Sequence, residues 1–287
     1  GDGTDLMDQL LDTSILRVGI RVWPEASFSP PAFRGFSNAA IGGAMNGFEV
    51  DVARQLANGL GLELELVEAY PPIIAGGDWR GEWDIALASL VPAEQPPANP
   101  VAPITYSNPY GIIPTAILVP KNSAINSLAQ LSGQRVGVFE HSVYQRLFTP
   151  NDTPVTVYGQ PLISQIPNSV RLIVLSNVQK AIRQMGRPAK DGPAEPSPAV
   201  DAVDAIVGPA PVFEQAVSEN KLPLKIVADE ANLAPHPLAV AVVPQNNLKV
   251  DRLVAEINKV LARLQRQGTL SEIYLRWYGQ DFSPPQP

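Results

Sequence analysis

The chain has 287 residues, of which 45% are hydrophobic and 17% are charged, so it can bury a substantial core and is not a disordered protein. Its net charge of −7 disfavours a surface for nucleic acid or for an anionic membrane, because both need clustered Lys and Arg. The absence of cysteine excludes disulfides, thiolate zinc sites and cysteine nucleophiles.

The first part of the sequence alternates strand and helix patterns. Residues 15–22 (ILRVGIRV) are an apolar run typical of a buried strand, and a loop rich in Gly, Pro and Ser follows at 24–46. Residues 48–62 place apolar residues at helical spacing, and residues 62–70 and 83–91 are predicted strands. A strand, a helix and a strand with short connections form a βαβ unit, which predicts a parallel sheet.

The middle of the chain repeats this alternation. We predict strands at 115–120, 135–141, 171–175, 203–208 and 238–244, and helices at 125–134, 142–148, 176–185 and 210–220. The proline- and glycine-rich residues 186–200 have no periodicity and are predicted to be a flexible insertion. Residues 248–279 are predicted to form two amphipathic helices separated at Gly268.

Two α/β units of similar size follow from this order. The apolar strands at 115–120 and 238–244 flank the middle unit, and we interpret them as crossovers. The predicted division is a lead-in at 1–14, a first lobe at 15–113 plus 235–280, a second lobe at 114–234 and a tail at 281–287.

Seven stretches carry a resemblance to a known family. They are LRVGIR, NGFEVDVARQLANGLGLELELVE, WDIALASL, YSNPYG, SLAQLSGQRVGVFEHS, VDAIVGPAP and GTLSEIYLRWYG. Their order and spacing resemble the periplasmic solute-binding proteins of ABC transporters, type II, solute-binding family 3, which bind polar amino acids. The resemblance implies an α/β clamshell in which two lobes, joined by two hinge strands, close on a small ligand. It implies neither catalysis nor a cofactor.

The same resemblance implies the cellular role. We expect a monomer that captures a small polar ligand, an amino acid or a related carboxylate or amine, and delivers it to an ABC permease in the inner membrane. The location would be periplasmic, or extracytoplasmic with a lipid anchor, after removal of a signal peptide. Two alternatives use the same fold: a ligand-sensing receptor ectodomain, and a dehydratase-like enzyme with Glu140, His141 or Glu25 as its base.

The first lobe supplies three candidate ligand residues after its first strand. Arg21 lies where the resemblance places a ligand-directed arginine, although it could equally pair with Glu25 or Glu140 on the surface. Trp23 and Phe28 would form an aromatic wall for the apolar part of a ligand, and the alternative is packing within the lobe.

The resemblance also reveals two departures from the family pattern. After the strand WDIALASL, Ser89 would offer its hydroxyl and N–H groups to the ligand, but Gln95 or Pro96 replaces the family's carboxylate-binding arginine. In the second lobe, Pro209 stands where the family commonly has an ammonium-binding aspartate. We therefore expect a ligand that is not a standard α-amino acid, or one that is bound in an altered orientation.

The remaining candidates lie where a strand leads into a helix, at FEHSVYQ. A helix N-terminus presents N–H groups suited to an anion, so Ser142 is a candidate donor, with capping as its alternative role. His141, Glu140 and Tyr144 are weaker candidates, and the simpler interpretation of His141 is a histidine bonded to the backbone. With only two histidines in the chain, we expect no metal site.

Overall fold

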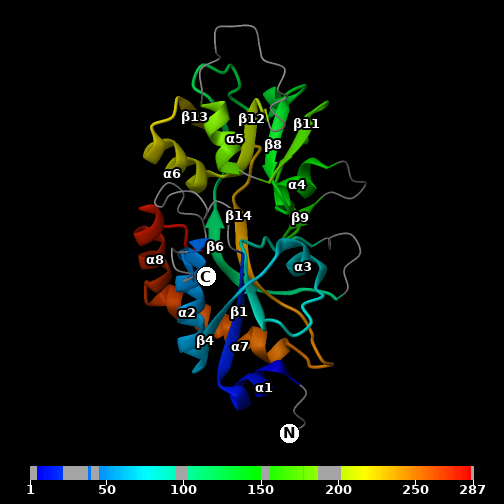
Figure 1. Ribbon diagram of the computed structural model, residues 1–287, viewed down its shortest axis with the longest axis vertical. Coiled ribbons are helices and arrows are strands. Elements are labelled where there is room, and N and C mark those ends of the chain that lie inside the picture. The colour runs from blue at the N-terminus through cyan, green and yellow to red at the C-terminus, as the bar shows by residue number, and fades with distance from the viewer. Residues whose placement is uncertain are drawn as a thin grey trace. The chain divides into compact units, whose positions relative to one another are not determined.

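The structure described here is a computed structural model, and it describes residues 5–21, 38–39, 45–94, 102–149, 155–176, 178–186 and 202–285. These residues form two compact units, the first within 5–112 and 237–285 and the second within 113–236. Each unit has its own five-stranded sheet with helices against it (Figure 1). The predicted α/β class with two lobes is confirmed.

The first unit is built around the sheet order β4-β1-β5-β14-β6. Strand β1 pairs in parallel with both β4 and β5, while β14 pairs antiparallel with β5. Helices α7 and α8 pack beside α2 (Figure 1). The elements of this unit are α1 (Leu6–Thr13), β1 (Ile15–Ile20), β2 (Asn38–Ala39), β3 (Met45–Asn46), α2 (Phe48–Leu60), β4 (Glu63–Glu68), α3 (Pro71–Gly76), β5 (Ile85–Leu87), β6 (Thr105–Ile113), β14 (His236–Val242), α7 (Asp251–Arg266) and α8 (Thr269–Tyr278).

The second unit has the sheet order β11-β8-β12-β7-β13. Strand β8 pairs in parallel with its neighbours β11 and β12, and β7 pairs antiparallel with β12 and β13. The elements are β7 (Thr115–Pro120), the 3₁₀ helix η2 (Leu128–Leu131), β8 (Arg135–Phe139), α4 (Val143–Phe148), β9 (Thr156–Val157), β10 (Gln160–Pro161), β11 (Arg171–Leu175), α5 (Val178–Met185), β12 (Ala205–Pro209), α6 (Ala210–Asn220) and β13 (Leu224–Val227).

Helix α2 shows how the apolar spacing becomes core. Phe48, Val52 and Leu56 recur along one face and are fully buried, and each such burial contributes roughly 1.5–3 kcal/mol. The Phe48 ring lies 4.5 Å from the ring of Tyr274 on α8. The helix ends at Gly61, whose φ of 72° is the left-handed conformation that terminates helices.

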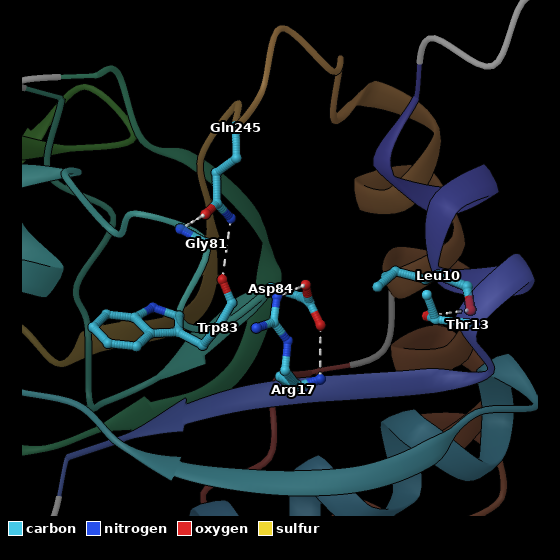
Figure 2. Close-up of polar contacts among 7 residues, drawn as sticks. All are labelled: Leu10, Thr13, Arg17, Gly81, Trp83, Asp84 and Gln245. Carbon is cyan, nitrogen blue, oxygen red and sulfur yellow. Dashed lines mark hydrogen bonds and ion pairs between the residues drawn. The ribbon is translucent and has the colours of Figure 1, made fainter.

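Each sheet has an equivalent Arg–Asp pair, in which an arginine on one parallel strand binds an aspartate just before the neighbouring parallel strand. In the first unit, the Arg17 backbone N–H and guanidinium donate to the Asp84 carboxylate at 2.8 and 3.1 Å, as Figure 2 shows. In the second, Arg135 repeats this with Asp204 at 2.8 and 2.9 Å, and that hydrogen-bonded pair lowers the pKa of Asp204. Each pair ties an inner strand, β1 or β8, to the start of its parallel neighbour, β5 or β12, so the two units share one local arrangement.

Three elements differ from the sequence-based expectation. The predicted lead-in contains α1, whose Leu6, Met7 and Leu10 are buried. The predicted helix at 125–134 is the four-residue 3₁₀ helix η2. Strand β7 pairs along its whole length with β12 and β13, so it belongs to the second sheet rather than to a crossover.

The chain passes between the units at two other points. It leaves the first unit after Ile112, at the end of β6, and returns to it after His236, at the start of β14. Apart from residues 38–39, 45–46 and Gly186, the predicted loop at 24–46 and the predicted insertion at 186–200 lie outside the described residues.

Candidate functional site

Three adjacent parallel strands of the first unit end at one edge of the sheet. Beyond β4, β1 and β5 lie Tyr70, Arg21 and Ser89 respectively, and the backbone N–H of Ala69 donates to the Ile20 carbonyl at 2.9 Å, which aligns the first two strand ends. Ligands of open parallel α/β sheets bind beyond the carboxyl ends of the strands. We call Arg21, Tyr70 and Ser89 the first rim.

A buried carboxylate lies behind the first rim. Glu49, in the first turn of α2, is fully buried and accepts the Ser89 backbone N–H at Oε2 and the Ser89 hydroxyl at Oε1, both at 2.8 Å. The Tyr110 hydroxyl, on β6, also donates to Oε2. Three donors from two elements therefore converge on one carboxylate, as a buried anion requires.

Opposing effects act on the acidity of Glu49. Burial is the larger effect and raises the pKa of the Glu49 carboxyl group above its usual value, although the hydrogen bonds from Tyr110 and Ser89 and the nearby positive charge of Arg21 act to lower it. Burial likewise raises the pKa of Tyr110, and the Glu49 carboxylate adds to that rise, so the phenol stays protonated and remains a donor.

This network corrects the expected role of Ser89. The sequence predicts that Ser89 offers its hydroxyl and its N–H to a ligand, but both hydrogens are already donated to Glu49. What Ser89 retains is the acceptor capacity of its hydroxyl oxygen. Its φ of 56° is uncommon for a non-glycine residue, and the bonds to Glu49 hold it there.

The second unit has a corresponding edge beyond β8 and β12. Glu140 and His141 follow β8, and Pro209 is the buried last residue of β12. The His141 Nε2 lies 3.5 Å from a Glu140 oxygen, and both side chains are partly exposed. We call Glu140, His141, Ser142 and Pro209 the second rim.

The predicted anion site at the start of α4 is not supported by these contacts. The His141 N–H donates to the Gln145 side chain at 2.8 Å, and the Ser142 N–H donates to the Phe139 carbonyl at 3.2 Å. The Ser142 hydroxyl donates to that same carbonyl at 2.6 Å rather than capping the helix. These donors are therefore satisfied within the loop, and α4 has only six residues.

Tyr144 lies apart from the second rim, in a buried polar cluster. Its hydroxyl lies 2.5 Å from His236 Nδ1 and 3.0 Å from Thr115 Oγ1. Burial raises the pKa of Tyr144 and lowers that of His236 to about 3, so both groups are neutral at physiological pH. The structure therefore gives Tyr144 internal partners instead of a position at a strand end.

The sequence analysis did not predict Tyr70, a member of the first rim, or Glu49, the buried carboxylate behind it. Tyr70 is 61% exposed and is separated from the end of β4 only by Ala69, so the combination of a strand end and an aromatic could have identified it. Glu49 lies in the first turn of α2, where an acidic residue commonly complements the helix dipole, and no sequence signal distinguishes that role from the buried acceptor seen here. The predicted residues Trp23, Phe28, Gln95 and Pro96 lie outside the described residues.

Two further properties of the described residues bear on function. Within the described ranges, no group of three or more His, Cys, Asp or Glu side chains is placed to hold a metal ion. None of the helices in the described part of the chain combines the length and apolarity needed to cross a membrane.

Comparison with known proteins gives concordant matches. Residues 20–280 match the family described as bacterial extracellular solute-binding proteins, family 3. A probable amino-acid ABC transporter-binding protein of Haemophilus influenzae is 24% identical, with 97% of this chain and 90% of that protein covered.

Solved structures of amino-acid-binding proteins also resemble this chain. An ancestral arginine-binding protein bound to arginine has a TM-score of 0.66 at 25% identity, covering 93% of this chain and 99% of that one. The arginine-, lysine-, histidine-binding protein ArtJ from Geobacillus stearothermophilus has a TM-score of 0.65 at 19% identity, covering 93% and 96%, and this likeness shows the fold alone.

Proposed function

This chain belongs to family 3 of the bacterial extracellular solute-binding proteins, and from that premise we propose that it captures a small polar ligand for an ABC importer. The observation that carries the proposal is the family match over residues 20–280, which spans both units and both rims. The protein would work in the periplasm or on a lipid anchor, as a monomer, with an ABC permease of the inner membrane as its partner.

The proposed ligand is an amino acid or a related carboxylate or amine. The relative from Haemophilus influenzae and the ancestral protein at 25% identity support this class, because their names refer to amino acids and to arginine. Arg21 would attract an anionic group, and the exposed ring of Tyr70 would pack against an apolar part of the ligand. Trp23, Phe28 and Gln95 remain proposed contacts on the sequence resemblance alone.

The chemistry of the rims favours a non-standard binding mode. Ser89 has given both hydrogens to Glu49, so it would accept a hydrogen bond from a ligand N–H or O–H group. Pro209 brings neither charge nor N–H to the second rim. A ligand at the first rim would rely on Arg21 and the Ser89 oxygen, and a ligand at the second rim on Glu140, in place of a paired carboxylate and ammonium clamp.

A thermal-shift screen tests the proposal. Amino acids, small carboxylates, guanidino compounds and polyamines are added to the purified protein, and the true class raises the melting temperature by mass action. The shift should fall sharply in Arg21→Ala at equal ligand concentration. A screen in which none of the four classes raises the melting temperature would overturn the proposal.

We propose binding without catalysis. Glu140 and His141 are neighbours at the second rim, where a base of the dehydratase-like alternative would have to lie, and both side chains are partly exposed to solvent. Incubation with cyclic hydroxy acids should leave them unchanged. Turnover that disappears in Glu140→Gln would establish the dehydratase-like alternative instead.

A further inference from the structure

The two points at which the chain passes between its units are joined by hydrogen bonds inside the second unit. Thr115 lies just beyond the first passage, and His236 is the last residue before the second. The Thr115 hydroxyl donates to the Ala234 carbonyl at 3.1 Å, and its oxygen lies 3.3 Å from His236 Nδ1. We call residues 113–115 and 234–236, which adjoin the two passages within the second unit, the connecting segments, and they are in direct polar contact.

Tyr144 adds a third element to this contact. Its hydroxyl, carried by α4, lies 2.5 Å from His236 Nδ1 and 3.0 Å from Thr115 Oγ1. The Tyr144 and His236 rings meet edge to face, with centroids 5.4 Å apart and an interplanar angle of 82°. Thr115, Tyr144 and His236 are 8%, 3% and 3% exposed, so water cannot replace these bonds readily.

The number of hydrogens available on Thr115, Tyr144 and His236 determines which residue donates in each hydrogen bond. The Thr115 proton goes to the Ala234 carbonyl, so Thr115 Oγ1 acts as an acceptor toward the other two residues. One arrangement then gives each short contact its own hydrogen: His236 Nδ1–H donates to the Tyr144 oxygen, and the Tyr144 O–H donates to Thr115 Oγ1. The result is a continuous chain from His236 through Tyr144 and Thr115 to the Ala234 carbonyl.

We propose that His236, Tyr144 and Thr115 form a clasp that fixes the two connecting segments to each other and so limits the range of orientations open to the two units. Tyr144 acts in it as a positioning residue, because its hydroxyl touches both segments while its own helix belongs to neither. The clasp does not depend on ligand identity or on the proposed function. It requires only that the chain has two units and two connections.

A simpler reading is that the cluster only stabilises the second unit. The two readings differ in what happens between the units when the tyrosine oxygen is removed. Under both interpretations the substitution lowers the melting temperature. Only if the cluster is a clasp does the substitution also widen the distribution of distances between the units. The test must therefore measure that distribution in folded protein.

Because the chain contains no cysteine, spin labels attach only at cysteines that are introduced for the measurement. Cysteines introduced at the exposed positions Asn58 on α2 and Ser218 on α6 place one spin label in each unit. Pulsed electron paramagnetic resonance on the full chain, without ligand, then gives the inter-label distance distribution. A second label pair, Lys121 with Ser218, lies entirely within the second unit and controls for local unfolding.

Tyr144→Phe and Thr115→Val should each broaden the Asn58–Ser218 distribution by roughly 1.5-fold or more and leave the Lys121–Ser218 distribution unchanged. His236→Asn retains an N–H near the Nδ1 position and should stay close to the unsubstituted protein, whereas His236→Leu should behave like Tyr144→Phe. The matched control is Tyr158→Phe, which removes the same atom from an exposed tyrosine of the same unit.

An unchanged Asn58–Ser218 distribution in Tyr144→Phe would overturn the clasp, even if the melting temperature fell. If Tyr144→Phe proved too unstable to label, Thr115→Val and the comparison of His236→Asn with His236→Leu decide the question. Equal broadening in those two His236 variants would also contradict the proposal, because the donor would then be irrelevant.

Discussion

The Glu49 carboxylate accepts both polar hydrogens of Ser89, the backbone N–H at Oε2 and the hydroxyl at Oε1, each at 2.8 Å. One residue on α2 thereby fixes the conformation of the loop that follows β5. Since the Tyr110 hydroxyl donates to the same carboxylate, the network also reaches β6. The shape of the first rim at Ser89 thus depends on a side chain that is itself fully buried.

Replacing Glu49 by Gln should destabilise the protein. The amide keeps one acceptor oxygen but turns its other end into a donor, so one of the three incoming hydrogens loses its acceptor or the Ser89 hydroxyl must turn away. A buried polar group left without a partner costs about 1–3 kcal/mol. Urea unfolding, read as the free energy extrapolated to water, measures this loss.

Glu65→Gln is the matched control for that experiment, because Glu65 is an exposed residue of β4. It should change the free energy of unfolding by less than about 0.5 kcal/mol. A Glu49→Gln variant as stable as Glu65→Gln would show that the three hydrogen bonds contribute no net stability.

The stability of the protein should fall in mild acid because of His236. Burial lowers the pKa of His236 to about 3, whereas an unfolded histidine titrates near 6.5. The unfolded state therefore binds more protons than the folded state between these values. The contribution of His236 is fully present above about pH 6.5 and is lost at up to about 1.4 kcal/mol per pH unit as the pH falls toward 3.

The measurement is the free energy of unfolding between pH 7 and pH 4.5, above the range in which most carboxylates titrate. His236→Asn removes the titrating ring and should flatten the slope. The chain has one other histidine, His141, which is exposed, and His141→Gln is the matched control for the substitution of a histidine. Equal slopes in the protein and in His236→Asn would mean that His236 does not have to stay neutral for folding.

The sequence patterns were sufficient for elements with strong periodicity. The apolar run at 15–22 and the helical spacing at 48–62 correspond to β1 and α2, and Gly61 and Gly268 mark real helix boundaries. Strand β6 was not predicted, because its central Ser107, Asn108 and Pro109 are typical turn residues and only pairing with β14 makes this segment a strand.

The site was harder to predict than the fold, for a physical reason. Sequence position places Arg21 and Ser89 at strand ends, but it does not show which hydrogens of Ser89 are already used. That depends on Glu49, forty residues earlier, and on Tyr110. Likewise, the position of Tyr144 five residues after β8 does not show whether its side chain contacts a ligand or His236. Only the folded structure shows that it contacts His236.

Arg21→Ala should weaken binding of the ligand identified by the thermal-shift screen by more than tenfold, about 1.4 kcal/mol. The reason is that Arg21 lies at the first rim and its guanidinium would pair with an anionic group of the ligand. Isothermal titration calorimetry measures the change. Arg54→Ala on the exposed side of α2 is the control, and an affinity unchanged by Arg21→Ala would remove Arg21 from the site.

Tyr70→Ala should weaken the same ligand, while Tyr70→Leu should restore part of the affinity. Tyr70 is 61% exposed, so its removal leaves no core cavity and stability should be nearly unchanged. A stacked aromatic contact contributes about 0.5–1.5 kcal/mol beyond area burial, which leucine cannot reproduce fully. Equal affinities in the protein and in Tyr70→Ala would show that the ligand does not reach the end of β4.

L-lysine and L-arginine should bind poorly, with dissociation constants above about 1 μM, or binding free energies weaker than about −8.2 kcal/mol. A standard α-amino acid presents a carboxylate that needs donors and an ammonium that needs an anion. At the first rim, Ser89 has donated both of its hydrogens to Glu49 and has none to give a carboxylate. At the second rim, Pro209 brings no anion to the position where the resemblance places the ammonium-binding aspartate. Calorimetric titration with each amino acid tests this, and submicromolar affinity for either would contradict the inferred binding mode while leaving solute capture itself intact.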